Sequence, residues 1–471
     1  MKAQKNLRWY NLAIMAFAMI WGFANMVNNF ALQGLGVIFS WVMVLALYFA
    51  PYALMVGELG SAFKEEKGGV ASWIGRTSGK RWAFFAGWTY WVVHIPYLAQ
   101  RPQAMLIAWG WITRQDTSLV EGLSPLVTQL ICLGLFFVFL WIASQGIKIL
   151  KPLGTIAGAA SLIMSLLFMV LMFAAPLFTH VQLDFSGWSW RTFIPKFDFQ
   201  YLTTLSMVLF AVGGAEKISP YIKYTKNPAK EFPKGMIALV ILVAVNALVG
   251  SLAMGLMYSG DIPEDLLTNG QYYAFVQLGE YYGAGNWLMM IYGVANLAVQ
   301  ATALAFAIDA PLRMLLADAD KDFVPDFLRK QNRKGIYVRG YLMTAVLTSI
   351  LIVIPAFGMG DMDGMFAWLL NLNTVVMPIR YIWVFLAYIL LKRQQDKFPS
   401  DYRFFRSRKW GCVVGGWCLA ITVIACALGM VPKGVESGWG LQLSLNIGTP
   451  IVLLALGGIL PWVARRRAQK V

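Results

Sequence analysis

The stretch Phe210-Ala-Val-Gly-Gly-Ala-Glu-Lys-Ile-Ser-Pro220 interrupts the middle of an apolar segment. The pair Gly213–Gly214 favours helix poorly, and Pro220 has no N–H to give to a helical ladder. Between them stand two adjacent charges, Glu216 and Lys217. Charges are costly inside an apolar span, so we expect these two to face a protein-lined or wet cavity, where broken backbone is also tolerated. The alternative is a kinked helix whose charges mark its end.

Composition places the chain in a membrane. Of its 471 residues, 59% are hydrophobic and only 13% are charged, about half the charged fraction of a typical soluble protein. Apolar runs of membrane-spanning length recur from end to end, and the first has no cleavage-like stop, which favours a retained helix over a signal peptide. We therefore predict an all-α polytopic membrane protein.

Twelve apolar ranges are predicted to be transmembrane helices. They are 10–31, 35–58, 82–112, 124–145, 152–178, 200–221, 235–259, 284–316, 337–357, 364–391, 410–431 and 443–464. They form a single transport domain over residues 1–464, and residues 465–471 form a short basic tail. No separate soluble domain is expected.

The distribution of charge predicts the orientation. Lys and Arg concentrate in the N-terminus, the tail and the even-numbered connections, whereas the alternate connections are acidic. Those acidic residues are Asp261, Glu264, Asp265, Glu280, Asp361 and Asp363. Because basic loops stay on the cytoplasmic side, both termini are predicted to be cytoplasmic. Orientation then accounts for the net charge of +16 without a nucleic-acid partner.

A second interruption lies in the first apolar range, Met19-Ile-Trp-Gly-Phe-Ala-Asn-Met-Val-Asn-Asn29. Paired broken helices in corresponding positions indicate the midplane site of a transporter, so spans 1 and 6 would head two five-helix inverted repeats, at about 10–178 and 200–391. Helices 11 and 12, at 410–464, would follow the repeats. The freed N–H groups of half-helices can bind a carboxylate, and freed carbonyls can accept from an ammonium. An amino acid suits both.

Four motifs resemble the amino acid–polyamine–organocation (APC) transporter family. They are Glu58…Gly68-Gly69-Val-Ala-Ser-Trp73…Gly79-Lys-Arg-Trp82, Gly214-Ala-Glu216, Asn227-Pro228…Pro233, and Pro311-Leu-Arg313…Val324-Pro325…Phe327…Asn332…Gly335. They are in order and correctly spaced over about two-thirds of the chain. Within the family, the chain looks most like the bacterial glutamate/4-aminobutyrate antiporter group.

The resemblance implies a leucine-transporter-like fold with substrate between spans 1 and 6 and exchange by alternating access. It places an aromatic gate at Phe210 and proton-sensitive gating at Glu216. Two departures weaken transfer of the substrate's identity. The family's glycine-rich first break is replaced here by Ile20-Trp21-Gly22, and an acid of its eighth span is replaced by Ala303.

The predicted binding residues lie around the two breaks. They are Ile20, Trp21, Gly22, Phe23, Asn25, Gly213, Gly214 and Ala215. Tyr381 is the candidate for a second gate, and Lys217, next to the Glu216 motif, has no assignable partner.

Other charges fall within the apolar ranges. Arg101 and Arg380 either form structural ion pairs or line an anion-selecting cavity, in which case they would favour a substrate with an acidic side chain. Asp309 and Arg313 are four residues apart and can pair on one helix face. His94 is expected to be a hydrogen-bonded packing residue rather than a proton relay.

The sequence thus predicts an inner-membrane amino acid antiporter, with an acidic amino acid and its decarboxylated product as candidate substrates and the lipid bilayer as its surroundings. The alternatives are a proton-coupled importer, an amine or polyamine exchanger, and, in another class, a channel or a non-transporting membrane subunit. Neither a metal-ligand cluster nor a nucleophile–base pair is visible, so we expect no enzyme activity, no metal and no cofactor. The oligomeric state is not predicted.

Overall fold

The computed structural model describes residues 7–183, 185, 188–258, 266–354, 362–432 and 439–468. Within these ranges the chain is helical, apart from connections and one isolated β-bridge between Leu7 and Thr225. This confirms the predicted all-α class. Asp261, Glu264, Asp265 and Asp361, which contributed to the predicted orientation, lie outside the described residues.

The α-helices, in chain order, are α1 (Trp9–Ile20), α2 (Phe23–Gln33), α3 (Val37–Val44), α4 (Ala50–Ala62), α5 (Val70–Ser78), α6 (Lys80–Val92), α7 (Ile95–Thr113), α8 (Ser118–Glu121), α9 (Pro125–Ala143), α10 (Ile147–Phe178), α11 (Trp190–Phe193), α12 (Phe199–Val212), α13 (Pro228–Met257), α14 (Leu266–Tyr281), α15 (Trp287–Leu316), α16 (Asp326–Arg329), α17 (Val338–Val353), α18 (Met362–Val376), α19 (Tyr381–Arg393), α20 (Arg408–Gly429), α21 (Trp439–Ala455) and α22 (Ile459–Ala468). Shorter non-α turns are η1 (Gly34–Gly36), η2 (Leu45–Phe49), η3 (Ala215–Tyr224), η5 (Met377–Arg380) and η6 (Leu456–Gly458).

In each of the twelve predicted ranges the described residues are mainly helical, with 259 and 355–357 lying outside the described part of the chain. Among the described residues, eight helical stretches are long and apolar enough to cross a membrane, and α1 and α17 are shorter apolar helices. The chain is therefore a multi-pass membrane protein. The count of twelve crossings and the inverted repeat stay predictions.

Both predicted breaks are present. Between α1 and α2 the backbone is extended at Trp21 (φ −107°, ψ 131°) and Gly22 (φ −132°, ψ 156°). Between α12 and η3 it is extended at Gly213, and Gly214 takes φ 122°, a conformation that L side chains rarely adopt. Each predicted span is thus two half-helices joined by a short extended segment.

Three features were not predicted. The third span turns at Val93–His94, between α6 and α7, just before Pro96. The tenth span tightens into η5 around Pro378. Helix α14 follows the seventh span, where the sequence analysis placed only a connection. The two prolines explain the first two interruptions, because proline cannot donate to the helical ladder.

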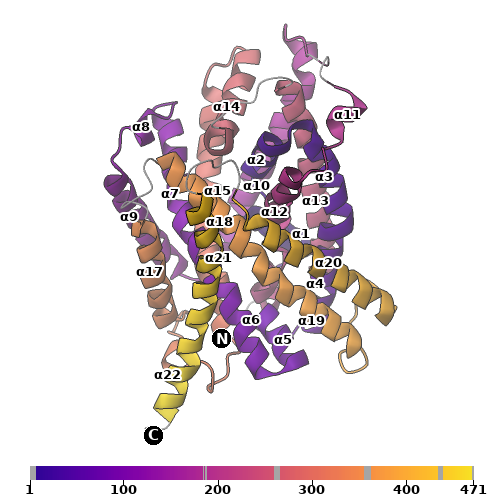
Figure 1. Ribbon diagram of the computed structural model, residues 1–471, viewed down its shortest axis with the longest axis vertical. Helices are drawn as coiled ribbons and strands as arrows, with labels where there is room; N and C mark the ends of the chain where they lie inside the picture. Colours follow the sequence, from indigo (N-terminus) through magenta and orange to yellow (C-terminus); the bar gives the residue numbers. More distant parts are fainter. Residues whose placement is uncertain are drawn as a thin grey trace.

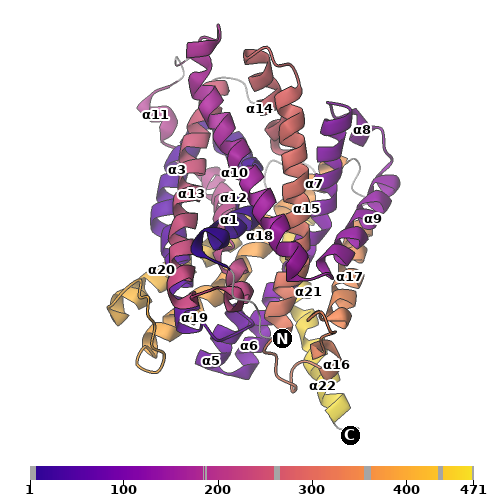
Figure 2. The same cartoon turned by 180° about the vertical axis from the view of Figure 1, so that it is seen from behind.

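The half-helices lie inside the bundle. Helix α1 packs against α10, α13, α15 and η3, and η3 also packs against α4 and α15. The long helices α10, α13 and α15 run beside them, with α5 and α22 toward one end of the bundle and α8, α11 and α14 toward the other (Figures 1 and 2).

Helix α15 also carries a buried charge pair. Arg313 Nε lies 2.6 Å from Asp309 Oδ2, which confirms the predicted pairing on one helix face. Tyr221 and Tyr341 donate their hydroxyls to the same carboxylate at 3.0 and 2.9 Å. This cluster fastens η3 and α17 to α15.

Candidate functional site

A cavity of about 60 Å³ lies where the two broken helices meet. The first break contributes Ile20, Trp21, Gly22 and Asn25, and the second contributes Phe210, Gly213 and Lys217. The remaining lining comes mainly from the facing sides of α7 and α15: Tyr97, Arg101, Asn296, Val299, Gln300 and Ala303. A Cβ added at Gly22 would meet no atom within 4 Å, so the backbone there borders open space.

Asn25 joins the two breaks. Its Nδ2 donates to the carbonyl of Ile20 at 3.0 Å and to that of Ala211 at 3.2 Å. Both carbonyls lie at the C-terminal end of a half-helix, where the helical ladder leaves acceptors without a partner. One amide therefore caps α1 and α12 together and fixes the distance between them.

Lys217, for which the sequence offered no partner, caps the same end of α1. Its Nζ donates to the carbonyl of Met19 at 3.2 Å and lies 5.1 Å from the centre of the Tyr97 ring. A cation is favourable at a helix C-terminus because the peptide dipoles place partial negative charge there. Lys217 and Asn25 thus occupy the acceptor end of α1, and the residues Gly22, Ala24 and Asn25 at the start of α2 line the cavity.

Arg101 is held in place by a ladder of amides on α15. Its Nη1 donates to Gln300 Oε1, and Gln300 Nε2 donates to Asn296 Oδ1 at 3.1 Å. The guanidinium also stacks on Tyr97, with Cζ 4.0 Å from the ring centre. Its Nε is buried and has no hydrogen-bond partner among the described residues. A buried donor without a partner is costly, so this edge of Arg101 is suited to a ligand oxygen.

Behind the cavity, Glu216 and Arg380 form a fully buried ion pair. Arg380 Nε lies 3.2 Å from Glu216 Oε1, although this N–H makes no directed hydrogen bond. Tyr90 donates its hydroxyl to the same Glu216 oxygen. Arg380 also contacts His94 Nε2 at 2.6 Å and donates to the Tyr381 hydroxyl at 3.0 Å. The network connects η3 with the third and tenth spans, immediately beside the second break.

Six of the predicted site residues do not line the cavity, and one of them is Glu216, which pairs with Arg380 behind it. Phe23 is buried among Phe168, Phe275 and Tyr292. Gly214 gives its N–H to Tyr52, and Ala215 is buried behind it. Arg380 and Tyr381 lie in the network just described, where Tyr381 is packed so closely that a Cβ on Gly213 would fall 1.7 Å from its hydroxyl. Of the two roles considered for Arg380, the buried ion pair with Glu216 fits its position. Tyr381 packs against Gly213 at the second break, on the side away from the cavity.

Of the residues on α7 and α15 that line the cavity, the sequence analysis named Arg101 and Ala303 but missed Tyr97, Asn296 and Gln300. Tyr97, Asn296 and Gln300 line the cavity and support Arg101, but they belong to no recognisable sequence motif. Their spacing held a weak signal, because Asn296, Gln300 and Ala303 fall on one face of a helix that is otherwise apolar. His94 is hydrogen-bonded to the Tyr90 carbonyl at 2.6 Å and fully buried, in agreement with the predicted packing role.

Among the described residues, the lining of the cavity carries two cations, Arg101 and Lys217, and no carboxylate. Glu216 stands close in sequence but faces Arg380 and Tyr90 instead. A site with this balance favours a ligand of net negative charge. Among the described residues, no group of three His, Cys, Asp or Glu side chains could hold a metal ion.

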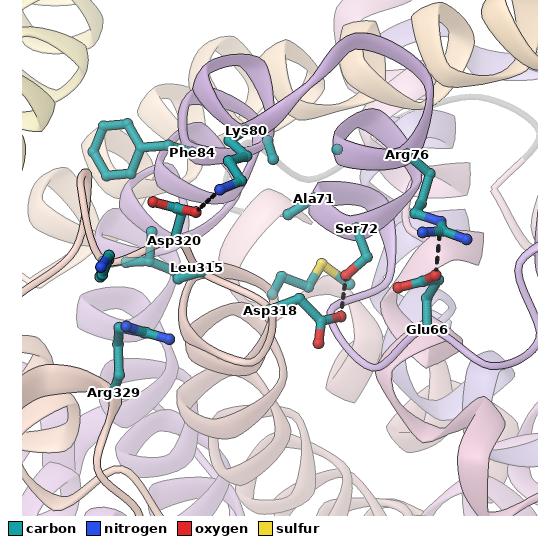
Figure 3. A pocket seen from close by; sticks show the side chains of 15 residues that line it. Glu66, Ala71, Ser72, Arg76, Lys80, Phe84, Leu315, Asp318, Asp320 and Arg329 are labelled. Atoms are coloured by element: carbon teal, nitrogen blue, oxygen red, sulfur yellow. Dashed lines mark hydrogen bonds and ion pairs between the residues drawn. The ribbon is translucent and has the colours of Figure 1, made fainter. Parts of the chain in front are cut away.

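A second cavity, of about 420 Å³, lies at the end of the bundle that carries α5 (Figure 3). Two ion pairs lie in its lining: Lys80 with Asp320 at 2.6 Å, and Arg76 with Glu66 at 3.1 Å. The hydrogen bond from Lys80 is the main cause that holds the pKa of Asp320 below its usual value. Asp318 accepts from the N–H groups of Lys67 and Gly68, at 3.0 and 2.9 Å, and from Ser72. These contacts clamp the α5 region to the end of α15, and we assign no ligand to this cavity.

Fold and site together define a multi-pass helical membrane protein with a small anion-favouring cavity between two broken helices. The sequence profile of the amino acid permease family matches residues 7–456. The chain is 52% identical, over 99% of its length and 97% of the relative's, to the aspartate/glutamate permease AcaP of Lactococcus lactis subsp. cremoris (strain MG1363).

More distant relatives agree. The inner membrane transporter YjeM of Escherichia coli (strain K12) is 24% identical over 95% of this chain and 94% of its own. The glutamate/gamma-aminobutyrate antiporter of Lactococcus lactis subsp. lactis (strain IL1403) is 23% identical over 86% and 80%. The protein therefore belongs to the amino acid permease family, as the resemblance to APC transporters predicted.

Proposed function

We propose that the protein carries acidic amino acids, aspartate or glutamate, across a bacterial inner membrane by alternating access at the two broken helices. The observation that carries this proposal is the charge balance of the cavity, where Arg101 and Lys217 meet no carboxylate. The high identity to an aspartate/glutamate permease over nearly the whole chain supports the same substrate class.

The geometry suggests a pose for the substrate. Its α-carboxylate would lie against the N–H groups at the start of α2, where the helix dipole favours an anion. Its ammonium would bind peptide carbonyls of the extended residues Trp21 and Gly213, which stand outside the regular helices. Its side-chain carboxylate would accept from the buried Nε of Arg101.

The cavity is too small to admit a substrate as it stands. About 60 Å³ is well below the 300–1,000 Å³ of an ordinary ligand pocket. Substrate entry therefore requires the surrounding half-helices or side chains to move. Phe210 is half-buried at the cavity wall and is the residue we assign to the gate. A substrate drives the cycle only by binding its occluded intermediates better than the open states.

Glu216 is the residue we assign to proton sensing. Protonation would remove its attraction to Arg380, beside the second break, and so free η3 to move. The twelve crossings, the inverted repeat and the cytoplasmic location of both termini belong to the same proposal. Its support is the helix in each of the twelve ranges and the breaks at corresponding places in the first and sixth.

The test is counterflow with purified protein in proteoliposomes. Vesicles loaded with unlabelled aspartate should accumulate labelled aspartate and glutamate in clear preference to asparagine, 4-aminobutyrate and agmatine. Preferred accumulation of a neutral or cationic substrate would refute the acidic assignment. An amine or polyamine exchanger is disfavoured in advance, because a cationic substrate would meet Arg101 and Lys217 without a neutralising carboxylate.

The coupling mode stays a prediction. Exchange requires labelled aspartate to enter only vesicles that contain internal substrate. Entry into empty vesicles under a pH gradient would instead support proton-coupled import, and steady conductance in planar bilayers would support a channel.

A further inference from the structure

A third cavity, of about 460 Å³, lies where the chain enters its first span. Its walls come from two separate elements, the start of α1 and the start of α13. The residues that carry the argument are Arg8, Trp9, Tyr10, Lys226, Glu231 and Lys234. The substrate cavity shares none of these residues.

The position is that of a membrane surface. Helix α1 is apolar apart from Asn11, and α13 contains one of the most hydrophobic spans of the chain, so the first residues of both helices stand at a bilayer boundary. Trp9 and Tyr10 are each 42% exposed there and pack edge to face. Exposed Trp and Tyr at a span end are typical of the headgroup region, where a ring can be half in contact with lipid.

Charge converges on this cavity from both walls. Arg8, Lys226 and Lys234 are exposed, and none of them takes part in an ion pair between described residues. The only carboxylate among the described lining residues, Glu231, accepts from the N–H of Trp9 at 2.9 Å. Basic residues alone are ordinary at the ends of spans. Here three cations from two elements line one cavity and are flanked by Trp9 and Tyr10, an arrangement more specific than scattered basic residues at a span end.

We propose that this cavity binds the phosphodiester headgroup of an anionic phospholipid. Arg8 offers a planar fork of donors that suits phosphate, and Lys226 and Lys234 add point charges from the opposite wall. The acyl chains of such a lipid would leave the cavity along the apolar surfaces of α1 and α13.

The bound headgroup would act on the moving parts of the protein. Leu7 donates its N–H to the Tyr224 carbonyl at 3.0 Å and accepts from the Lys226 N–H at 2.9 Å. This clamp fastens the segment before α1 to the segment after η3, and α1 and η3 are half-helices that border the substrate cavity. A phosphate held by Arg8 on one side and Lys226 on the other would keep the clamp closed.

Native mass spectrometry of the intact protein released from nanodiscs tests the assignment. Nanodiscs would contain phosphatidylcholine alone or phosphatidylcholine mixed with phosphatidylglycerol. We expect wild-type protein to retain phosphatidylglycerol, and each of Arg8→Gln, Lys226→Gln and Lys234→Gln to lower retention about five-fold. Lys230→Gln is the matched control, because Lys230 is exposed one turn from both lysines but does not line the cavity.

A second readout addresses the clamp. Amide hydrogen exchange around residues 7–12 and 224–228 should be slower in nanodiscs that contain phosphatidylglycerol, and this protection should be lost in Arg8→Gln. Inorganic phosphate added to phosphatidylcholine nanodiscs distinguishes a soluble source of the same chemistry. If it alone protects these amides, or if Lys230→Gln loses as much lipid as the three cavity variants, the lipid assignment is overturned. If substrate counterflow fails while lipid retention is as expected, only the proposed transport function falls.

Discussion

Replacement of Arg101 by glutamine should change which amino acids the protein accepts. The half-buried guanidinium lines the cavity, and its buried Nε has no hydrogen-bond partner in the described part of the chain. A charge-assisted hydrogen bond to a carboxylate contributes about 1.5–3 kcal/mol, which corresponds to about a 10- to 150-fold change in affinity. The estimate for exposed ion pairs, about 0–1 kcal/mol, does not apply because this edge is shielded from water. Aspartate should therefore lose affinity by that factor, whereas asparagine, which has no charge to lose, should change much less.

The assay is competition in counterflow. Labelled aspartate would be challenged with unlabelled aspartate and asparagine, and the ratio of the two inhibition constants would be compared between wild type and Arg101→Gln. Arg114→Gln is the matched control, since Arg114 is exposed just beyond the end of the same helix, α7. The reasoning is refuted if the ratio is unchanged in Arg101→Gln, or if Arg114→Gln shifts it equally.

Three further predictions follow from single contacts. Gly213→Ala should destabilise the protein by about 1–3 kcal/mol or more, because the added Cβ would fall 1.7 Å from the Tyr381 hydroxyl. Gly22→Ala is the control and should leave the melting temperature nearly unchanged, because its Cβ would meet open space. Equal melting temperatures for the two variants would contradict this reasoning. Gln300→Glu should place a carboxylate on Arg101 and shift preference from aspartate toward asparagine, while Gln300→Ala should weaken binding of aspartate without that reversal. Because Lys80 lowers the pKa of Asp320, the stability from this pair is fully present above the ordinary Asp range and is lost only as pH falls below about 4. The difference in melting temperature between wild type and Asp320→Asn should therefore be constant from about pH 7 to about pH 5 and should shrink in stronger acid; a change within the upper range would count against the pair.

The breaks could be predicted from the sequence because glycine and proline act locally. Gly22 and Gly213–Gly214 interrupt apolar runs, and no distant residue is needed to see that a helix is weakened there. The pairing of Asp309 with Arg313 was predictable for the same reason, since both stand on one helix face.

The partners of the other buried charges could not be predicted, because they depend on which helices pack together. Arg380 and Arg101 looked alike in sequence, yet Arg380 pairs with Glu216 from η3 while Arg101 faces the cavity. Lys217 finds its partner in the backbone of Met19, and a carbonyl leaves no signature in a sequence. Tyr97 and Gln300 were invisible as site residues because aromatic and amide side chains serve many packing roles in membrane helices.

A structure of the protein with L-aspartate bound, in a bilayer mimetic, tests the central claim most directly. We expect the amino acid between the breaks at Trp21–Gly22 and Gly213, with its side-chain carboxylate within hydrogen-bond distance of Arg101 Nε. Aspartate at another place, or a continuous helix through either break in the bound state, would contradict the account.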